Sequence, residues 1–130
     1  MKTLGQYWME NNTKGPSFGL NALGIVNGQF FCDPMTREDI DNFVQTYRDA
    51  AVFMKSVGFD ALEIHFGHGY GLCQFISPLT NRRKDEYGGS LVNRMRLPLR
   101  VLAAVRKAVG PNFPLLAKIS LTEAFPGGLN

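Results

Sequence analysis

Two histidines and a tyrosine lie within the six-residue run 65–70, HFGHGY. If the chain turns after His65, the side chains of His65 and His68 can both donate N–H groups to one acceptor, and Tyr70 offers a weak acid two residues further on. Paired donors stabilise negative charge that develops on an oxygen, and a phenol can deliver a proton to an adjacent carbon in a dry site. The spacing therefore suits the polarisation of a carbonyl group.

Two other interpretations stay open on spacing alone. The histidines can be satisfied polar groups in a turn, and a His-x-x-His pair can also chelate a metal, as in a barrel metallohydrolase. No third ligand stands at a convincing spacing, although Glu63, two steps before His65, shares its strand face. We expect no metal here.

A short apolar pattern leads into His65. It predicts a mostly buried strand over 59–65, with Phe59, Ala61, Leu62 and Ile64 as its apolar members. Ligands of parallel α/β sheets bind beyond the carboxyl ends of strands, so a histidine at this point is a candidate site residue. The glycines that follow, Gly67, Gly69 and Gly71, come close to a dinucleotide fingerprint. Leu72 stands in place of its third glycine and we expect no helix to open there, so we set that interpretation aside.

The flanking segments complete a helix, strand, loop, helix, strand order with a parallel right-handed crossover. Thr36 and Asp39 predict a capping box, and an amphipathic helix follows until Gly58. Its apolar positions are Ile40, Phe43, Val44, Tyr47, Ala50, Ala51, Met54 and Val57. Residues 1–33 are predicted to be irregular and loop-rich, with one weak strand near 23–26.

The second half repeats the pattern after a long connection over 66–89, which we expect to be an ordered excursion. Ser90 predicts the cap of a helix that bends near Leu97, because Pro98 lies inside it, and that ends at Gly110. Its apolar positions are Leu91, Met95, Leu99, Leu102, Val105 and Val109. Five residues of the connection are expected to form a self-paired, solvated clamp: Asn81, Arg82, Arg83, Asp85 and Glu86.

A second buried strand is predicted over 115–120, LLAKIS, with Lys118 as its charged member. An unpaired buried ammonium group is costly, so Lys118 should face an anion or a ligand dipole at the strand end, or reach the barrel rim as a solvated lysine. Both interpretations stay open on the residues alone.

Composition narrows the class of protein. The 130 residues are 45% hydrophobic and 19% charged, with a net charge of +3. The tight basic cluster 82–84 is followed at once by two acidic residues, which argues against a nucleic-acid patch. The uncharged span 15–32 is too rich in proline, asparagine and glycine for a bilayer. Cys32 and Cys73 form no metal or disulfide pattern, and no secretory signal stands at the N-terminus, so we expect a cytoplasmic protein.

The run HFGHGYGLCQFISPLTNRRKDEYGGSLVNRMR, residues 65–96, resembles the signature region of the old yellow enzyme family of FMN-dependent NAD(P)H oxidoreductases. The resemblance extends from about Met35 to Ser120, and more loosely on both sides. It implies a fragment of a (β/α)8 TIM barrel, roughly strands 4 and 5 with their flanking helices. Residues 34–130 would form this partial domain, and residues 1–33 would be its irregular, loop-rich N-terminal segment.

The resemblance also implies roles. His65 and His68 would hold and polarise the carbonyl oxygen of an activated alkene or enone, and Tyr70 would protonate its α carbon after hydride arrives from FMN, which NAD(P)H reduces. Lys118 matches a position where many members carry an arginine at the flavin ring; a lysine keeps the charge but lacks the bidentate fork.

Length sets a second expectation. A closed barrel of this kind typically needs roughly 250 residues. The resemblance implies that the phosphate-binding loops lie outside these 130 residues. The alternative to an ene-reductase is therefore a truncated, catalytically inactive segment without a complete flavin site, of marginal stability and prone to aggregate.

Overall fold

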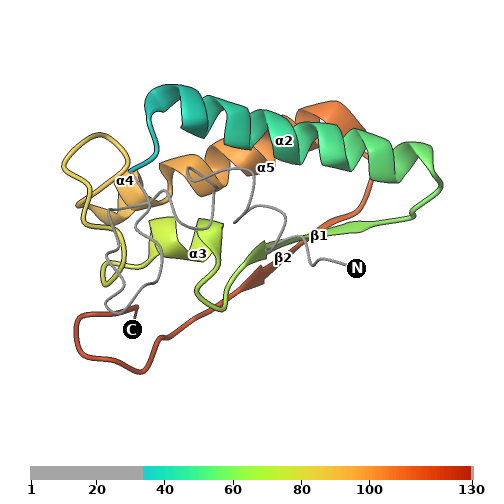
Figure 1. Cartoon of the computed structure of the whole chain (residues 1–130). Helices are drawn as coiled ribbons and strands as arrows, with labels where there is room; N and C mark the ends of the chain where they lie inside the picture. Colours follow the sequence, from blue (N-terminus) through green and yellow to red (C-terminus); the bar gives the residue numbers. More distant parts are fainter. Residues whose placement is uncertain (1–33, 130) are drawn as a thin grey trace, which may run out of the picture.

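The computed structural model describes residues 34–129 as a two-stranded parallel sheet with two long helices lying over one of its faces (Figure 1). The elements in chain order are α2 (Arg37–Ser56), β1 (Leu62–Phe66), α3 (Gly71–Ile76), α4 (Leu91–Arg94), α5 (Arg96–Val109) and β2 (Leu115–Ile119). The predictions for 1–33, including the weak strand, Cys32 and the uncharged span, lie outside the described residues. None of the described helices combines the length and the apolar content that a membrane crossing requires.

The predicted capping box at the start of α2 is confirmed. The Thr36 N–H donates to Asp39 Oδ2 at 2.8 Å, and the Asp39 N–H donates to Thr36 Oγ1 at 3.1 Å. Gly58 follows the helix with a φ of +95°, the left-handed conformation that glycine adopts most readily. The buried face is narrower than predicted, because Val57 is 55% exposed and Ala50 is also exposed.

β1 begins later than predicted and ends one residue later. Phe59 precedes the strand and is 51% exposed, so its place in a buried strand was wrong. Ile64 and Phe66 are buried against the helices and alternate with Glu63 and His65, which share the opposite face. The helix-facing side of β1 joins one hydrophobic core made by Ile40, Phe43, Phe75, Leu97, Val101, Val105 and Val109 among others.

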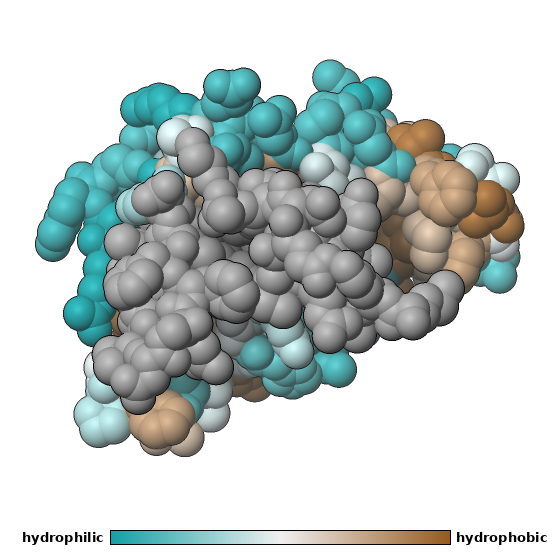
Figure 2. All heavy atoms as spheres, viewed as in Figure 1, coloured by the Kyte–Doolittle hydropathy of each residue, from teal (hydrophilic) through white to brown (hydrophobic). Residues whose placement is uncertain are grey.

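β2 pairs with β1 in parallel, which confirms the βαβ crossover. The prediction that β2 is buried was wrong for the part of the chain described: Leu116 is 51% exposed and Ile119 is 48% exposed. β1 is the only strand that pairs with β2 among residues 34–129, so one edge of β2 stays open there. A second group of exposed apolar side chains lies where α2 ends, as Figure 2 shows. Its members are Val52, Phe53, Val57 and Phe59.

The helix after Ser90 is interrupted at Met95, two residues before the expected bend. Ser90 Oγ accepts from the Asn93 N–H at 3.3 Å, which confirms the cap. Pro98 occupies the third position of α5, where an N–H is not needed. In one continuous helix its ring would meet the carbonyl of Arg94, which explains why the break precedes it. Leu99, predicted to be on the apolar face, is 54% exposed.

The connection between β1 and α4 is ordered, as expected, but its clamp is not simply solvated. Asn81 is only 5% exposed, and its Nδ2 donates to the carbonyls of Phe75 and Tyr87, each at 2.7 Å. Asp85 pairs with Arg83 through three hydrogen bonds. The clamp is therefore a pinned loop in which a buried amide joins two backbone segments.

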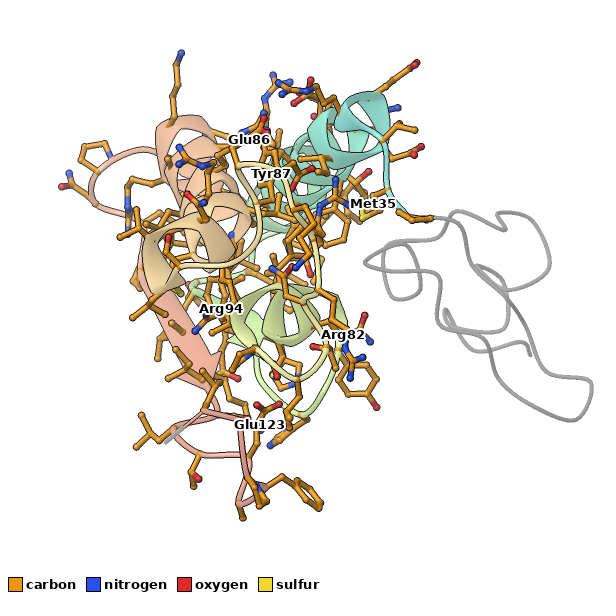
Figure 3. All side chains as sticks on the ribbon, turned by 90° about the vertical axis from the view of Figure 1, so that its left-hand side faces the viewer. Met35, Arg82, Glu86, Tyr87, Arg94 and Glu123 are labelled. Atoms are coloured by element: carbon orange, nitrogen blue, oxygen red, sulfur yellow. The ribbon has the colours of Figure 1, made fainter. Side chains whose placement is uncertain are left out.

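Outer contacts tie this loop to α2. Arg37 pairs with Glu86 at 2.8 Å, and Arg83 Nη1 donates to the Met35 carbonyl at 3.0 Å. Figure 3 shows Glu86 and Tyr87 beside the beginning of α2. A Cβ added at Gly88 would collide with the carbonyl of Arg83, so the two backbone segments pass too closely for any side chain at position 88.

Candidate active site

The structure brings His65, His68 and Tyr70 together at the carboxyl end of β1. The rings of His65 and His68 have centroids 4.9 Å apart, and the rings of His65 and Tyr70 have centroids 5.8 Å apart. His65 is half-buried within the strand, while His68 and Tyr70 are exposed. Three groups that can donate hydrogen bonds are thus gathered on one accessible patch.

A left-handed turn brings the three side chains together. His68 has a φ of +57° and Gly69 a φ of +72°, so two consecutive residues adopt a conformation that is rare outside glycine. The Tyr70 N–H donates to the Gly67 carbonyl at 3.3 Å, which closes the turn. The chain reverses here, and His68 and Tyr70 return toward His65.

α3 begins directly after this turn, with Tyr70 as its N-cap residue. The expectation that no helix opens near Gly71 was therefore wrong. Leu72 still argues against a dinucleotide fingerprint, because its side chain is fully buried in the core at the position where the third glycine is required. The short helix anchors the turn to the core and leaves the Tyr70 ring outside it.

Ser120 contacts this turn and was not singled out from the sequence. The His68 N–H donates to Ser120 Oγ at 3.1 Å, although the two residues are 52 positions apart. A Cβ added at Gly67 would lie 2.9 Å from Ser120 Oγ. The signal that points to Ser120 is its place immediately after β2, since the carboxyl ends of adjacent parallel strands share one edge.

Lys118 is placed beside the histidines by the strand register. It pairs in register with His65, so both side chains leave the sheet on the same face, which Glu63 and Leu116 also share. The Lys118 side chain is exposed, and therefore solvated, among the described residues. This location agrees with both earlier interpretations: a lysine at the rim, and a cation available to a ligand.

Three charged residues of the loop find partners in the protein: Arg83 pairs with Asp85, and Glu86 pairs with Arg37. The Arg83 guanidinium beside Asp85 holds the pKa of that carboxyl below its usual value, and the Tyr87 N–H, which donates to Asp85, acts in the same direction. Within residues 34–129, no group of three or more His, Cys, Asp or Glu side chains lies close enough to hold a metal ion.

Comparisons with known proteins agree on one family. Residues 4–130 match the NADH:flavin oxidoreductase / NADH oxidase family. The chain is 44% identical over 117 residues to an NADPH dehydrogenase of Bacillus licheniformis, covering 90% of this chain and 34% of that protein. It is 38% identical over 125 residues to 4,4'-dithiodibutanoate disulfide reductase of Rhodococcus erythropolis, covering 93% of this chain and 30% of that protein.

Solved structures show the same likeness. A 2-naphthoyl-CoA reductase complex superposes with a TM-score of 0.81 at 34% identity, covering 89% of this chain and 18% of that one. Morphinone reductase superposes with a TM-score of 0.63 at 36% identity, covering 70% of this chain and 25% of that one. The chain spans about a third or less of the length of each of these four proteins.

Proposed function

The chain belongs to the NADH:flavin oxidoreductase / NADH oxidase family, and from this premise we propose that it carries the substrate-polarising part of an FMN-dependent NAD(P)H oxidoreductase that reduces activated alkenes or enones. The observation that carries the proposal is the grouping of His65, His68 and Tyr70 at the carboxyl end of β1. The whole activity would also draw on parts of the fold that these residues do not contain.

His65 and His68 are proposed to bind the carbonyl oxygen of the substrate. Both rings can present an N–H toward one oxygen, since their centroids are only 4.9 Å apart. Two donors directed at one oxygen stabilise the negative charge that develops there when the conjugated alkene gains electrons. The pair would thus bind the substrate and make its β carbon more electrophilic.

Tyr70 is proposed to hold the proton that the α carbon receives. Its ring lies 5.8 Å from that of His65 and is 62% exposed, so a substrate held by the histidines would meet the phenol. A phenol is a weak acid that transfers its proton only when a strong base, such as an enolate carbon, develops beside it.

Lys118 is proposed to contact the flavin ring. It is the register partner of His65 on the same sheet face, and an ammonium group complements the electron-rich N1 and carbonyl edge of a flavin. The donor set of this face therefore fits the ring portion of FMN. When bound, the flavin would supply the hydride and take its electrons from NAD(P)H.

The strand pairing also fits a larger fold. We propose that β1 and β2 correspond to strands 4 and 5 of a (β/α)8 barrel. The parallel pairing, the helical crossover and the site at the carboxyl edge all agree with that architecture. The exposed Leu116 and Ile119 on β2 are then surfaces that neighbouring barrel elements would cover.

That exposure also favours the second candidate, a segment that does not turn over by itself. The deciding experiment titrates the purified chain with FMN and follows the quenching of flavin fluorescence. NADPH is then added without oxygen to reduce the flavin, and 2-cyclohexenone is added to reoxidise it. Saturable binding followed by both half-reactions supports the oxidoreductase, whereas no binding at millimolar FMN supports the inactive segment.

A further inference from the structure

We propose that Ser120 and Gln74 are positioning residues that hold the His68–Gly69 turn from its two sides and thereby aim His68 at the carbonyl oxygen and Tyr70 at the α carbon of one bound ligand. The proposal rests on the proposed function for its chemistry, but its structural half stands separately. Neither residue needs to touch the substrate. Each acts on the backbone that carries the donors.

Ser120 holds the side of the turn that faces β2. Its Oγ accepts the His68 N–H at 3.1 Å, and it packs against Gly67 closely enough that a methyl group there would lie 2.9 Å from the oxygen. The hydrogen bond thus joins the loops that leave two neighbouring strands. Because Lys118 lies two residues before Ser120, the same contact ties the turn to the strand that carries Lys118.

Gln74 holds the other side from within α3. Its Nε2 donates to the Gly69 carbonyl at 2.8 Å, and its own N–H donates to the Tyr70 carbonyl at 2.9 Å. Its Oε1 is buried without a hydrogen-bond partner. Burying an unpaired acceptor is unfavourable, so a side chain needed only for packing would do better as an apolar residue of this length. We infer that Gln74 is an amide because its Nε2 is needed as the donor to the Gly69 carbonyl.

The two contacts fall on the strained part of the chain. His68 keeps a positive φ although it is not glycine, and such a conformation persists only where the surroundings fix it. Ser120 binds the N–H of His68, and Gln74 binds the carbonyl of the next residue. Losing either contact should let the turn relax toward ordinary backbone angles and carry the His68 ring away from His65.

The first test measures amide hydrogen exchange in the full 130-residue chain by NMR. Ser120→Ala should speed exchange at the His68 N–H by roughly tenfold, with the amides of Ile64 and Val101 unchanged. Ser120→Thr, which keeps the hydroxyl, should restore protection. Ser56→Ala is the matched control, because Ser56 also makes one side-chain hydrogen bond, to the Phe53 carbonyl at 2.7 Å.

The second test separates positioning from folding. In the flavin-loaded chain, Ser120→Ala and Gln74→Met should each raise the KM for 2-cyclohexenone by roughly tenfold with a smaller change in kcat. The proposal would be overturned if Ser120→Ala left the exchange rate of the His68 N–H unchanged. It would also be overturned if Ser56→Ala raised that rate as much as Ser120→Ala does. If the wild-type chain shows no turnover, the proposed function fails, and the exchange data alone decide whether Ser120 fixes the turn.

Discussion

His65 and Lys118 face each other across the β1–β2 pair as register partners, with both side chains on the sheet face that the helices leave open. Because the strand register sets the proximity of His65 and Lys118, that proximity does not depend on the loops. A cation and a hydrogen-bond donor are therefore fixed to rigid strands, while His68 and Tyr70 depend on the turn that follows.

The charge on Lys118 should matter for flavin affinity. Lys118→Met keeps most of the aliphatic stem and removes the charge, so we expect FMN binding to weaken by about tenfold, while Lys118→Arg stays within about threefold of wild type. Fluorescence titration measures both. Lys107→Met, on the exposed side of α5, controls for the loss of one positive charge. Equal affinities for Lys118→Met and Lys118→Arg would remove Lys118 from the flavin site.

Tyr70→Phe should separate the two half-reactions. The hydroxyl is not needed to reduce the flavin, so the rate with NADPH should be unchanged, and reoxidation by an enone should slow by about a hundredfold. Stopped-flow absorbance resolves the two rates. The fold should tolerate the change, because the ring is 62% exposed. Equal slowing of both steps would show that the phenol is not the proton donor.

Asn81 should be one of the more sensitive positions for stability. Replacing it with Leu leaves the carbonyls of Phe75 and Tyr87 and the N–H of Arg83 without this partner, so we expect a loss of roughly 2–4 kcal/mol. Urea unfolding followed by circular dichroism measures the change. Asn42→Ala, at an exposed position of α2, should stay within about 0.5 kcal/mol of wild type. Similar values for the two variants would mean that the buried amide does not pin the loop.

Asp85 should make stability depend on pH in the acid range. Its pKa in the folded chain is lowered, first by the hydrogen bonds from Arg83, so its ionised form stabilises the fold above the ordinary carboxyl pKa of about 4. That contribution to stability is lost as the pH falls from about 4 through the lower pKa that Asp85 has in the folded chain. Asp85→Asn should therefore cost roughly 1 kcal/mol at pH 6 and progressively less toward pH 2.

Unfolding curves at several pH values test this difference. Asp49→Asn serves as the control, because Asp49 is an exposed carboxylate on α2. A difference between wild type and Asp85→Asn that stays constant from pH 6 to pH 2 would contradict the assignment.

Local signals in the sequence were sufficient for much of the fold. The Thr36–Asp39 capping box and the stop at Gly58 depend on residues close together in the chain, and the order of the predicted helices and strands pointed to the parallel crossover. The structure confirms all three. The grouping of the two histidines with Tyr70 was also within reach, because all three lie within six residues. Their chemical roles stay predictions.

Other features depend on contacts that spacing does not encode. The break at Met95 follows from a clash one turn before Pro98, and Leu99 lies off the face of α5 that Leu97 and Val101 bury. Ser120 reaches the site only because β2 pairs with β1 in one particular register. The apolar composition of β2 predicted that the strand is buried. Composition alone does not show whether residues 34–129 also supply the layer that would cover β2.

The close approach at Gly88 limits how this region can diverge. Any side chain there would strike the carbonyl of Arg83, and Asn81 Nδ2 donates to two backbone carbonyls, so point changes at positions 81 and 88 have few neutral outcomes. Substitutions are more readily tolerated after β2 at Leu121 and Phe125, which are 82% and 67% exposed. A library of variants should therefore randomise Leu121 and Phe125 and keep Asn81 and Gly88 constant.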